Sequence, residues 1–215
     1  MTATRSPRPV RRVLGAVALT GLLLGAAACG GTDEEPDDTA RTARDGSQFN
    51  DADVEFATQM IPHHAQAVEM VVLAEGRDVD PEIAALMTDI REAQVPEVQT
   101  MTEWLTTWGE PVPETGLDHA NAGHDGGSHD MEDDEAMGEA MTGMMTSEEM
   151  QELREADDAE FEQLWLEMMT EHHEGAVEMA ETEVAEGLHP DAVALAESVI
   201  TSQSAEIEAM EELLG

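Results

Sequence analysis

The sequence contains no tyrosine and no lysine, and phenylalanine and tryptophan occur only three times each. Any core must therefore be aliphatic and rich in methionine rather than aromatic. Nine arginines stand against 49 acidic residues, so the formal net charge is −40. Such a surface attracts cations and repels nucleic acid and anionic lipid, which excludes nucleic acid as a partner. The residues in excess are fifteen methionines and eight histidines.

Cysteine occurs once, at Cys29, and its surroundings explain it. Four arginines within residues 1–12 precede an apolar run over residues 13–24, and small residues connect this run to the cysteine. The order is typical of a secretory signal peptide, and the run is shorter than the roughly 20 residues of a membrane-spanning helix. We therefore predict an extracytoplasmic protein, in which no second thiol is present for a disulfide or a thiolate metal site.

The Ala-Ala-Cys sequence at residues 27–29 resembles the lipobox of bacterial lipoproteins, whose cysteine is diacylated and becomes the mature N-terminus. This resemblance predicts a signal peptide over residues 1–28 and membrane attachment through lipid on Cys29; the alternative is an unmodified thiol. Removal of four of the nine arginines and no acid leaves five against 49, a net charge of −44. Residues 29–47 are acidic with almost nothing to bury, so we expect a disordered tether before a folded domain at 48–214.

One motif occurs twice, 109 positions apart. Residues 60–70 and residues 169–179 both read M-x-x-H-H-x-x-A-V-E-M. On a helix the methionines and histidines of each copy share one broad stripe, whereas the glutamate points away from it. Thioethers and imidazoles therefore lie on the face that should be buried.

Capping residues, glycines and prolines divide the chain into helices. Asn50 or Asp51 can cap a first helix that ends near Gly76, with a kink expected at Pro62 inside it. Further helix starts are expected at Pro81, at a capping box formed by Thr146 and Glu149, at Asp157-Asp158 and at Pro190. No strand is expected.

The repeat extends beyond the motif. With the same offset of 109, residues of the first half match residues of the second: Phe56 with Trp165, Pro81 with Pro190, Gln94 with Gln203, Glu97 with Glu206, Leu105 with Leu214. Two helical hairpins that each expose one apolar stripe bury it most simply against each other. We therefore predict an all-α fold, a four-helix bundle built from two repeated αα-hairpins, whose pseudo-twofold axis brings the two His-His pairs together. Association of two such bundles into a homodimer stays possible.

Methionine and histidine together suit copper, since thioethers favour Cu(I) and imidazoles accept Cu(II). In each motif the first methionine lies one turn before the histidines, so one turn can offer both donors to one ion. Adjacent histidines diverge by about 100° on a helix, and we expect one of each pair at a shared central site and the other at a peripheral site. The predicted metal ligands are Met60, His63, His64, Met70, Met169, His172, His173 and Met179, with Met101 and Met210 as further candidates that could equally be core residues. Gln94 and Gln203 could donate hydrogen bonds around the site or could be exposed.

Other interpretations stay open. Methionines at helical spacing are ordinary core residues, and buried histidines are usually hydrogen-bonded, which describes a structural or interaction module. A haem or metal centre that reacts with oxygen or peroxide is a further alternative. The Glu-x-x-His pattern of di-iron bundles occurs only at Glu186 and His189, at a helix end, and no His-Glu-x-x-His or nucleophile motif is present. No catalytic residue is predicted, and we interpret the chain as a binding protein rather than an enzyme.

Residues 114–143 interrupt the repeat. This insert lacks helical or strand periodicity and carries three histidines spaced by five, followed by methionines among carboxylates. We expect it to be largely mobile. It is either an acidic loop without chemistry or a segment that captures metal loosely.

The paired motifs carry a family resemblance. The sequence F-x-x-x-M-I-P-H-H-A-Q-A-V-E-M at residues 56–70, with its counterpart at residues 167–179, is similar to the domain-of-unknown-function family numbered 305. The resemblance covers about residues 48–214. It implies a ferritin-like four-helix fold, a secreted protein or lipoprotein of bacteria, and a link to copper binding and tolerance through the motif methionines and histidines.

Overall fold

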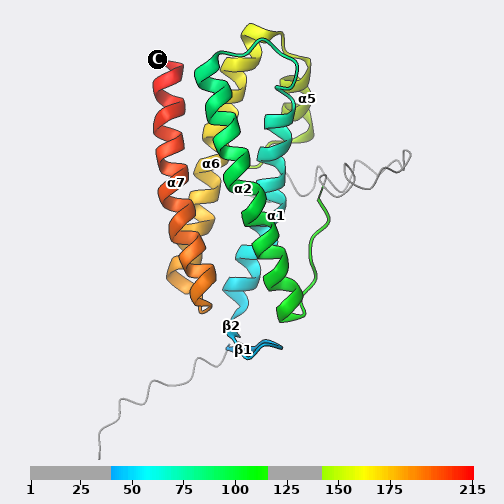
Figure 1. The fold of residues 1–215 in the computed structure, drawn as a ribbon, viewed down its shortest axis with the longest axis vertical. Helices are drawn as coiled ribbons and strands as arrows, with labels where there is room; N and C mark the ends of the chain where they lie inside the picture. Colours follow the sequence, from blue (N-terminus) through cyan, green and yellow to red (C-terminus); the bar gives the residue numbers. More distant parts are fainter. Residues whose placement is uncertain (1–39, 116–141) are drawn as a thin grey trace, which may run out of the picture. The chain divides into compact units, whose positions relative to one another are not determined.

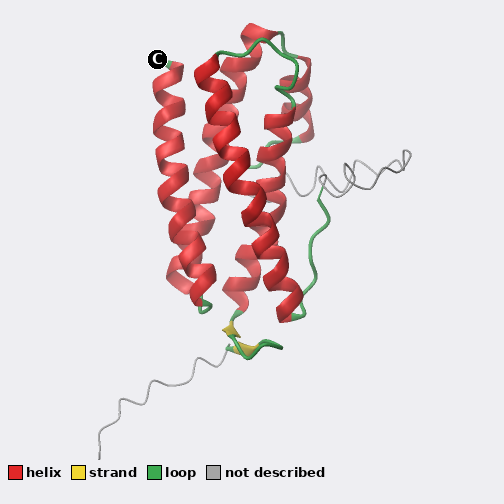
Figure 2. Cartoon of the chain, viewed as in Figure 1, coloured by secondary structure: helices red, strands yellow, loops and turns green. Residues whose placement is uncertain are grey.

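The computed structural model describes residues 40–115 and 142–215, which all belong to one compact unit, Pro36–Gly215. The described chain is almost entirely helical (Figures 1 and 2). The helices are α1 (Asp51–Val72), α2 (Pro81–Trp108), α5 (Ser147–Glu155), α6 (Asp158–Glu186) and α7 (Pro190–Leu214). Two-residue strands β1 (Arg41–Thr42) and β2 (Gln48–Phe49) precede them. Cys29, the predicted signal peptide and residues 116–141 of the insert lie outside the described residues.

The expected helix starts are confirmed. Asn50 caps α1 by accepting a hydrogen bond from the Asp53 amide, and the Asp53 carboxylate accepts one from the Asn50 amide in return. Thr146 and Glu149 form the same reciprocal box at α5. Both prolines predicted to open helices occupy the first position of α2 and α7, where their missing N–H costs nothing.

Two details at the ends of helices differ from expectation. Helix α1 ends at Val72 rather than near Gly76, because residues 73–76 form turns before Gly76 adopts a left-handed φ of 85°. Leu214 is 39 % exposed, although its counterpart Leu105 is fully buried. Leu214 is the last residue of α7, so no following helical turn covers it, and this repeat pair does not share one environment.

The C-terminal end of the expected tether is structured. Strands β1 and β2 pair antiparallel, with Arg41 opposite Phe49. The Arg41 guanidinium lies 2.9 Å from Asp51 and 2.7 Å from Glu110, and Phe49 stacks on Trp108 with ring centroids 4.8 Å apart. Composition alone predicted disorder here because Arg41 and Phe49 anchor the hairpin through Glu110 and Trp108, which are distant in sequence.

The four long helices run side by side, and α5 packs against α6 (Figure 1). Helix α1 packs along α2, α6 packs along α7, and α1 contacts α6 between the two hairpins. The buried apolar residues form two clusters, one around Phe56, Met60 and Met101 and one around Trp165, Met169 and Met210. On both α1 and α6 the paired histidines lie between the two clusters. Within the described residues, no helix is long and apolar enough to cross a bilayer.

The two hairpins contact each other in matching ways. The Asp53 carboxylate on α1 accepts a hydrogen bond of 2.8 Å from the His189 amide, in the loop before α7. The Glu162 carboxylate on α6 accepts one of 2.5 Å from the Asp80 amide, in the loop before α2. Both partners in the first contact are related to those in the second by 109 positions. A carboxylate on the first helix of each hairpin thus accepts a hydrogen bond from the interhelical loop of the other hairpin.

Candidate metal centre

All four motif histidines are fully buried, at 0 % exposure. Helix α1 supplies His63 and His64, and helix α6 supplies His172 and His173. Since an imidazole is polar at two ring nitrogens, burying four of them between apolar clusters is unfavourable unless each nitrogen finds a partner. The partners divide the histidines into an inner and an outer pair.

The inner pair consists of His63 and His172. Their ring centroids lie 3.7 Å apart, with the ring planes inclined at 42°. Both nitrogens of both rings are buried without a hydrogen-bond partner in the described part of the chain. Each such group costs about 1–3 kcal/mol relative to a satisfied one. Two unsatisfied imidazoles in direct contact are therefore a feature that the stability of the fold does not explain.

The outer pair consists of His64 and His173, and each has a carboxylate partner on the second helix of its own hairpin. His64 Nε2 lies 2.8 Å from Glu97 Oε2, and His173 Nε2 lies 2.7 Å from Glu206 Oε2. Both carboxylates are 17 % exposed. Each accepts from Nε2–H, and Nδ1 of both rings is buried without a partner among the described residues.

Sequence reasoning missed Glu97 and Glu206 as functional residues, although it aligned them as repeat partners. Each lies 33 positions after the second histidine of its motif. The sequence did offer a signal: an acidic residue, Glu97 or Glu206, occurs at the same repeat position beside the predicted apolar stripe of each half. The division into one inner and one outer histidine per helix follows the expected divergence of adjacent side chains.

Burial sets the protonation of the inner pair. Desolvation lowers the pKa of His63 well below its usual value, and repulsion by His64 and His173 adds to this. The backbone of Thr142 opposes the shift in part, although it does not reach hydrogen-bonding geometry with either ring nitrogen. Desolvation likewise lowers the pKa of His172, with further lowering by His63, His173 and His64. Both rings are therefore neutral near pH 7. A neutral imidazole has the free lone pair that a metal ligand needs.

Among the outer residues, desolvation lowers the pKa of His173, and the hydrogen bond and charge of Glu206 oppose it. The carboxylate also fixes the orientation of the ring, as carboxylates do behind metal-bound histidines. In the described residues, no group of three or more His, Cys, Asp or Glu side chains is placed to hold a metal ion.

The predicted methionines flank the histidines on both sides. Met60 and Met101 are fully buried in one apolar cluster, with Met179 partly buried against it. The other cluster contains their counterparts, all fully buried: Met169, Met210 and Met70. Three of the six predicted thioether ligands thus belong to each cluster, contributed by three different helices. Met101 and Met210 belong to these sets as much as the motif methionines do.

Two glutamines lie at matched positions near this layer. Gln94 and Gln203 are each 2 % exposed, so the expectation that they could be exposed is wrong. Both amide atoms of Gln94 and the carbonyl of Gln203 lack a hydrogen-bond partner in the described residues. The motif glutamates Glu69 and Glu178 are exposed, as expected.

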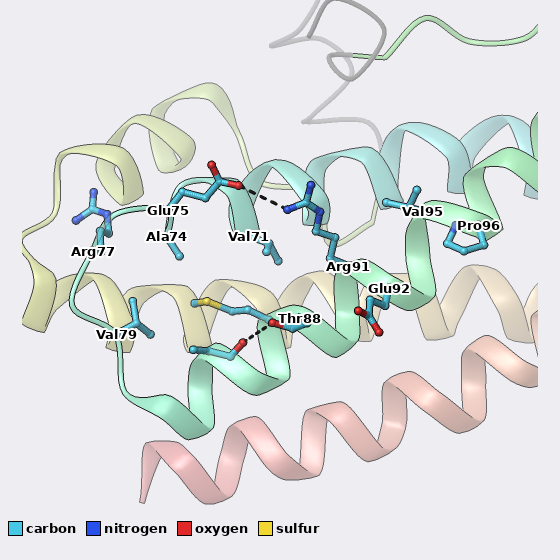
Figure 3. Close-up of a pocket in the computed structure, with 12 residues that line it drawn as sticks. Val71, Ala74, Glu75, Arg77, Val79, Thr88, Arg91, Glu92, Val95 and Pro96 are labelled. Atoms are coloured by element: carbon cyan, nitrogen blue, oxygen red, sulfur yellow. Dashed lines mark hydrogen bonds and ion pairs between the residues drawn. The ribbon is translucent and has the colours of Figure 1, made fainter. Parts of the chain in front are cut away.

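Two cavities open on the described surface, and neither contains the paired histidines. The larger, about 850 Å³, lies beside the loop between α1 and α2, where Glu75 and Arg91 form an ion pair of 3.5 Å (Figure 3). The smaller, about 320 Å³, lies along the seam between α1 and α6 and is lined by Thr142 and Met179 among others. Only the smaller cavity includes a predicted metal ligand.

Several solved structures resemble the chain. A DUF305 protein from Streptomyces coelicolor is 34 % identical, over 76 % of this chain and 91 % of that one, with a TM-score of 0.62. A DUF305 fragment from Deinococcus radiodurans is 26 % identical, over 81 % of this chain and 99 % of that one, with a TM-score of 0.63. CopM in its Cu(II)-bound form is 28 % identical, over 75 % and 95 % of the two chains, with a TM-score of 0.57.

CopM has also been solved in Cu(I)-bound and Ag-bound forms. Among curated proteins, none matches this chain. The family model described as "Domain of unknown function (DUF305)" matches residues 53–214, which include both histidine motifs and all four long helices. The chain therefore belongs to the DUF305 family.

Proposed function

We propose that the protein is an extracytoplasmic copper-binding protein that sequesters copper through the paired histidines and the methionines around them. The observation that carries this proposal is the inner pair: His63 and His172 are neutral, fully buried, in contact with each other and without hydrogen-bond partners among residues 40–115 and 142–215. A protein keeps such a costly arrangement where a ligand satisfies it. The ligand must accept nitrogen lone pairs, and a metal ion does so.

The donor set favours copper among metals. Imidazole nitrogens bind several first-row ions, but thioethers are soft donors that select Cu(I). Met60 precedes His63 by three residues, and Met169 precedes His172 by three, so each thioether lies on the same helix face as its histidine. We assign His63 and His172 as central ligands, with Met60 and Met169 beside them. His64 and His173, oriented by Glu97 and Glu206, are peripheral ligands through Nδ1.

The remaining thioethers extend this set. Met70, Met101, Met179 and Met210 belong to the same two apolar clusters as Met60 and Met169. They can hold Cu(I) as it moves away from the centre. CopM, which is 28 % identical in its Cu(II)-bound form and has Cu(I)-bound and Ag-bound forms as well, supports a metal of this class.

We further propose that the fold is a ferritin-like four-helix bundle of two repeated hairpins. Three pairs of contacts support the repeat at the offset of 109: the two His–Glu bonds, the two loop caps, and the two methionine sets. In this arrangement the domain spans residues 48–214, and a signal peptide at 1–28 and lipid on Cys29 attach it to the membrane. The relative from Streptomyces coelicolor carries the name of a secreted protein, which supports the location. The insert at 114–143 serves as a loose metal trap.

Metal titration of the mature protein tests the proposal. Copper is added to the metal-free wild type and to the variant His63→Leu/His172→Leu, and bound metal is measured by elemental analysis after dialysis against a competing chelator. The wild type retains copper and the variant does not. The variant Glu69→Gln/Glu174→Gln, altered at exposed motif positions, is the matched control and retains copper. Equal copper retention by wild type and inner-pair variant would falsify the assignment.

A second measurement addresses the structural alternative. If the histidines only stabilise the core, all four need hydrogen-bond partners, and His64 and His173 alone have them in the described structure. A nitrogen-15 spectrum of the metal-free protein distinguishes the cases. We expect the two ring nitrogens of His63 and His172 to show no hydrogen-bonded shift, in contrast to the Nε2 atoms of the outer pair.

A further inference from the structure

The smaller cavity differs from the rest of the buried interior in its chemistry. It runs along the seam between α1 and α6, has a volume of about 320 Å³, and receives carboxylates from both helices. The acidic residues that line it are Asp51, Glu55, Glu178, Glu183 and Glu186. Met179, a predicted thioether ligand, and Thr142 line it as well. No basic residue does.

The cavity points toward the inner histidines. On α1 its lining residues end at Gln59, one helical turn or about 6 Å before His63. On α6 they end at Glu178 and Met179, about two turns from His172. Thr142 lies close to both the cavity and the inner pair, because it lines the cavity and its backbone raises the pKa of His63. The cavity therefore extends from the surface to the level just below the inner pair.

Glu183 is a buried group that the fold does not use. It is 1 % exposed, lines the cavity, and neither carboxylate oxygen has a hydrogen-bond partner in the described residues. Its neighbour Asp53, by contrast, is fully engaged and accepts from the amides of Asn50, Leu188 and His189. Asp53 holds the loop before α7, whereas Glu183 lines the cavity as a neutral carboxylic acid, because burial and the neighbouring Asp53 raise its pKa to about 9.

The internal repeat provides a comparison for this seam. At the related positions, 109 residues away, four of the polar cavity residues are replaced by apolar ones, whereas Asp51, Glu178 and Glu186 keep charged counterparts. The four replacements are Glu55 by Leu164, Gln59 by Met168, Thr182 by Leu73 and Glu183 by Ala74. Leu164, Met168, Leu73 and Ala74 all belong to the apolar cluster that also includes Met150 and Leu153 of α5. One seam is therefore packed with apolar side chains beneath α5, and the other is polar and open. The two halves of the repeat therefore share the histidine motif but differ in the polarity of the seam that leads from solvent toward it.

We propose that the cavity between α1 and α6 is the entrance through which a copper ion passes from solvent to His63 and His172. The proposal rests on the proposed function and adds its route. The carboxylates at the mouth raise the local concentration of cations, as acidic clefts do for charged ligands. The positive charge of the arriving ion lowers the pKa of the Glu183 carboxyl, which releases its proton to solvent, and the carboxylate oxygens then replace water around the ion. The Met179 thioether receives the ion next, before the imidazoles.

Loading kinetics test the route. Cu(II) sulfate is mixed with the metal-free mature protein in a stopped-flow instrument, and quenching of tryptophan fluorescence reports arrival. The sealed variant Glu55→Leu/Gln59→Met/Thr182→Leu copies the apolar residues of the other seam. Its association rate falls at least tenfold, while its equilibrium affinity stays within about threefold, because closing a path slows entry and exit alike.

A second variant depends less on packing. In the neutralised variant Asp51→Asn/Glu55→Gln/Glu178→Gln/Glu186→Gln, only exposed side chains of the mouth change. We expect a slower association rate and a weaker dependence of that rate on salt. The control neutralises four exposed acids elsewhere and keeps the wild-type rate within about twofold: Glu160→Gln, Glu208→Gln, Glu211→Gln, Glu212→Gln.

The outcomes separate the route from the function. Wild-type association rates in both cavity variants would overturn the route and leave copper binding at the inner pair intact. A large loss of affinity at an unchanged association rate would also overturn it, because the cavity would then hold the ion rather than admit it. If the variant His63→Leu/His172→Leu binds copper as the wild type does, the proposed function fails first, independently of either cavity variant.

Discussion

Replacing the inner histidines by leucine should stabilise the metal-free protein. His63 and His172 each bury two ring nitrogens without partners, and leucine has a similar volume without polar atoms. At about 1 kcal/mol for each of these four nitrogens, the variant His63→Leu/His172→Leu gains about 4 kcal/mol. For a domain of this size that raises Tm by roughly 8–16 °C. Thermal unfolding followed by circular dichroism at pH 7.5, with chelator present, measures the change.

The outer pair is the matched control, and its response has the opposite sign. In His64→Leu/His173→Leu the carboxylates of Glu97 and Glu206, each 17 % exposed, lose their partners, so Tm falls. If the inner-pair variant melts at or below the wild-type temperature, the inner imidazoles have partners in solution and the reasoning about them is refuted. Copper at a hundred times its Kd should stabilise the wild type by about 2.7 kcal/mol and the inner-pair variant by nothing.

The remaining predictions concern pH, packing and the outer carboxylates. The pKa values of His63 and His172 are lowered in the folded state, so as pH falls below 6.5 these histidines are protonated in the unfolded chain before they are protonated in the folded one. Each histidine then lowers the free energy of unfolding by about 1.4 kcal/mol per pH unit. In denaturant titrations, the free energy of unfolding of His63→Leu/His172→Leu should therefore fall less steeply with decreasing pH than that of the wild type. Burial, with help from Asp53, raises the pKa of Glu183 to about 9 from a usual 4.5, so the wild type loses stability as pH rises between these values, and Glu183→Gln should be the more stable protein at pH 8 but not at pH 4.5. A Cβ on Gly175 would lie 2.2 Å from the Thr142 carbonyl oxygen, so Gly175→Ala should cost about 1–3 kcal/mol in a urea melt; an unchanged midpoint would contradict the close packing of residues 142–143 on α6.

The parts of the fold that follow local rules could be predicted from the sequence. Caps, first-turn prolines and helical periodicity act within a few residues, and the starts of the helices at Asn50, Pro81, Thr146, Asp157 and Pro190 followed from them. The repeat supplied long-range information as well. Two copies of one motif on two hairpins predicted that one histidine of each pair would lie at a shared centre but not which one, and the structure places the ring centroids of His63 and His172 3.7 Å apart.

Features that depend on a single distant partner could not be predicted in this way. The hairpin at residues 41–49 exists because Arg41 reaches Glu110 and Phe49 reaches Trp108, and neither partner is near in sequence. The roles of Glu97 and Glu206 needed the register of α2 against α1 and of α7 against α6. Predicting the acidic cavity would also have required the position of Thr142 relative to α1 and α6, because residues from all three places line the cavity. The repeat alignment shows the substitutions that open this seam, but only coordinates show that they line one space.

Anomalous diffraction at the copper edge tests the central claim most directly. Crystals of the mature protein loaded with one equivalent of copper should show a single strong anomalous peak between the rings of His63 and His172, within bonding distance of an imidazole nitrogen from each helix. A peak confined to the acidic surface or to residues 116–141, with the two inner rings still in contact and unliganded, would contradict the account.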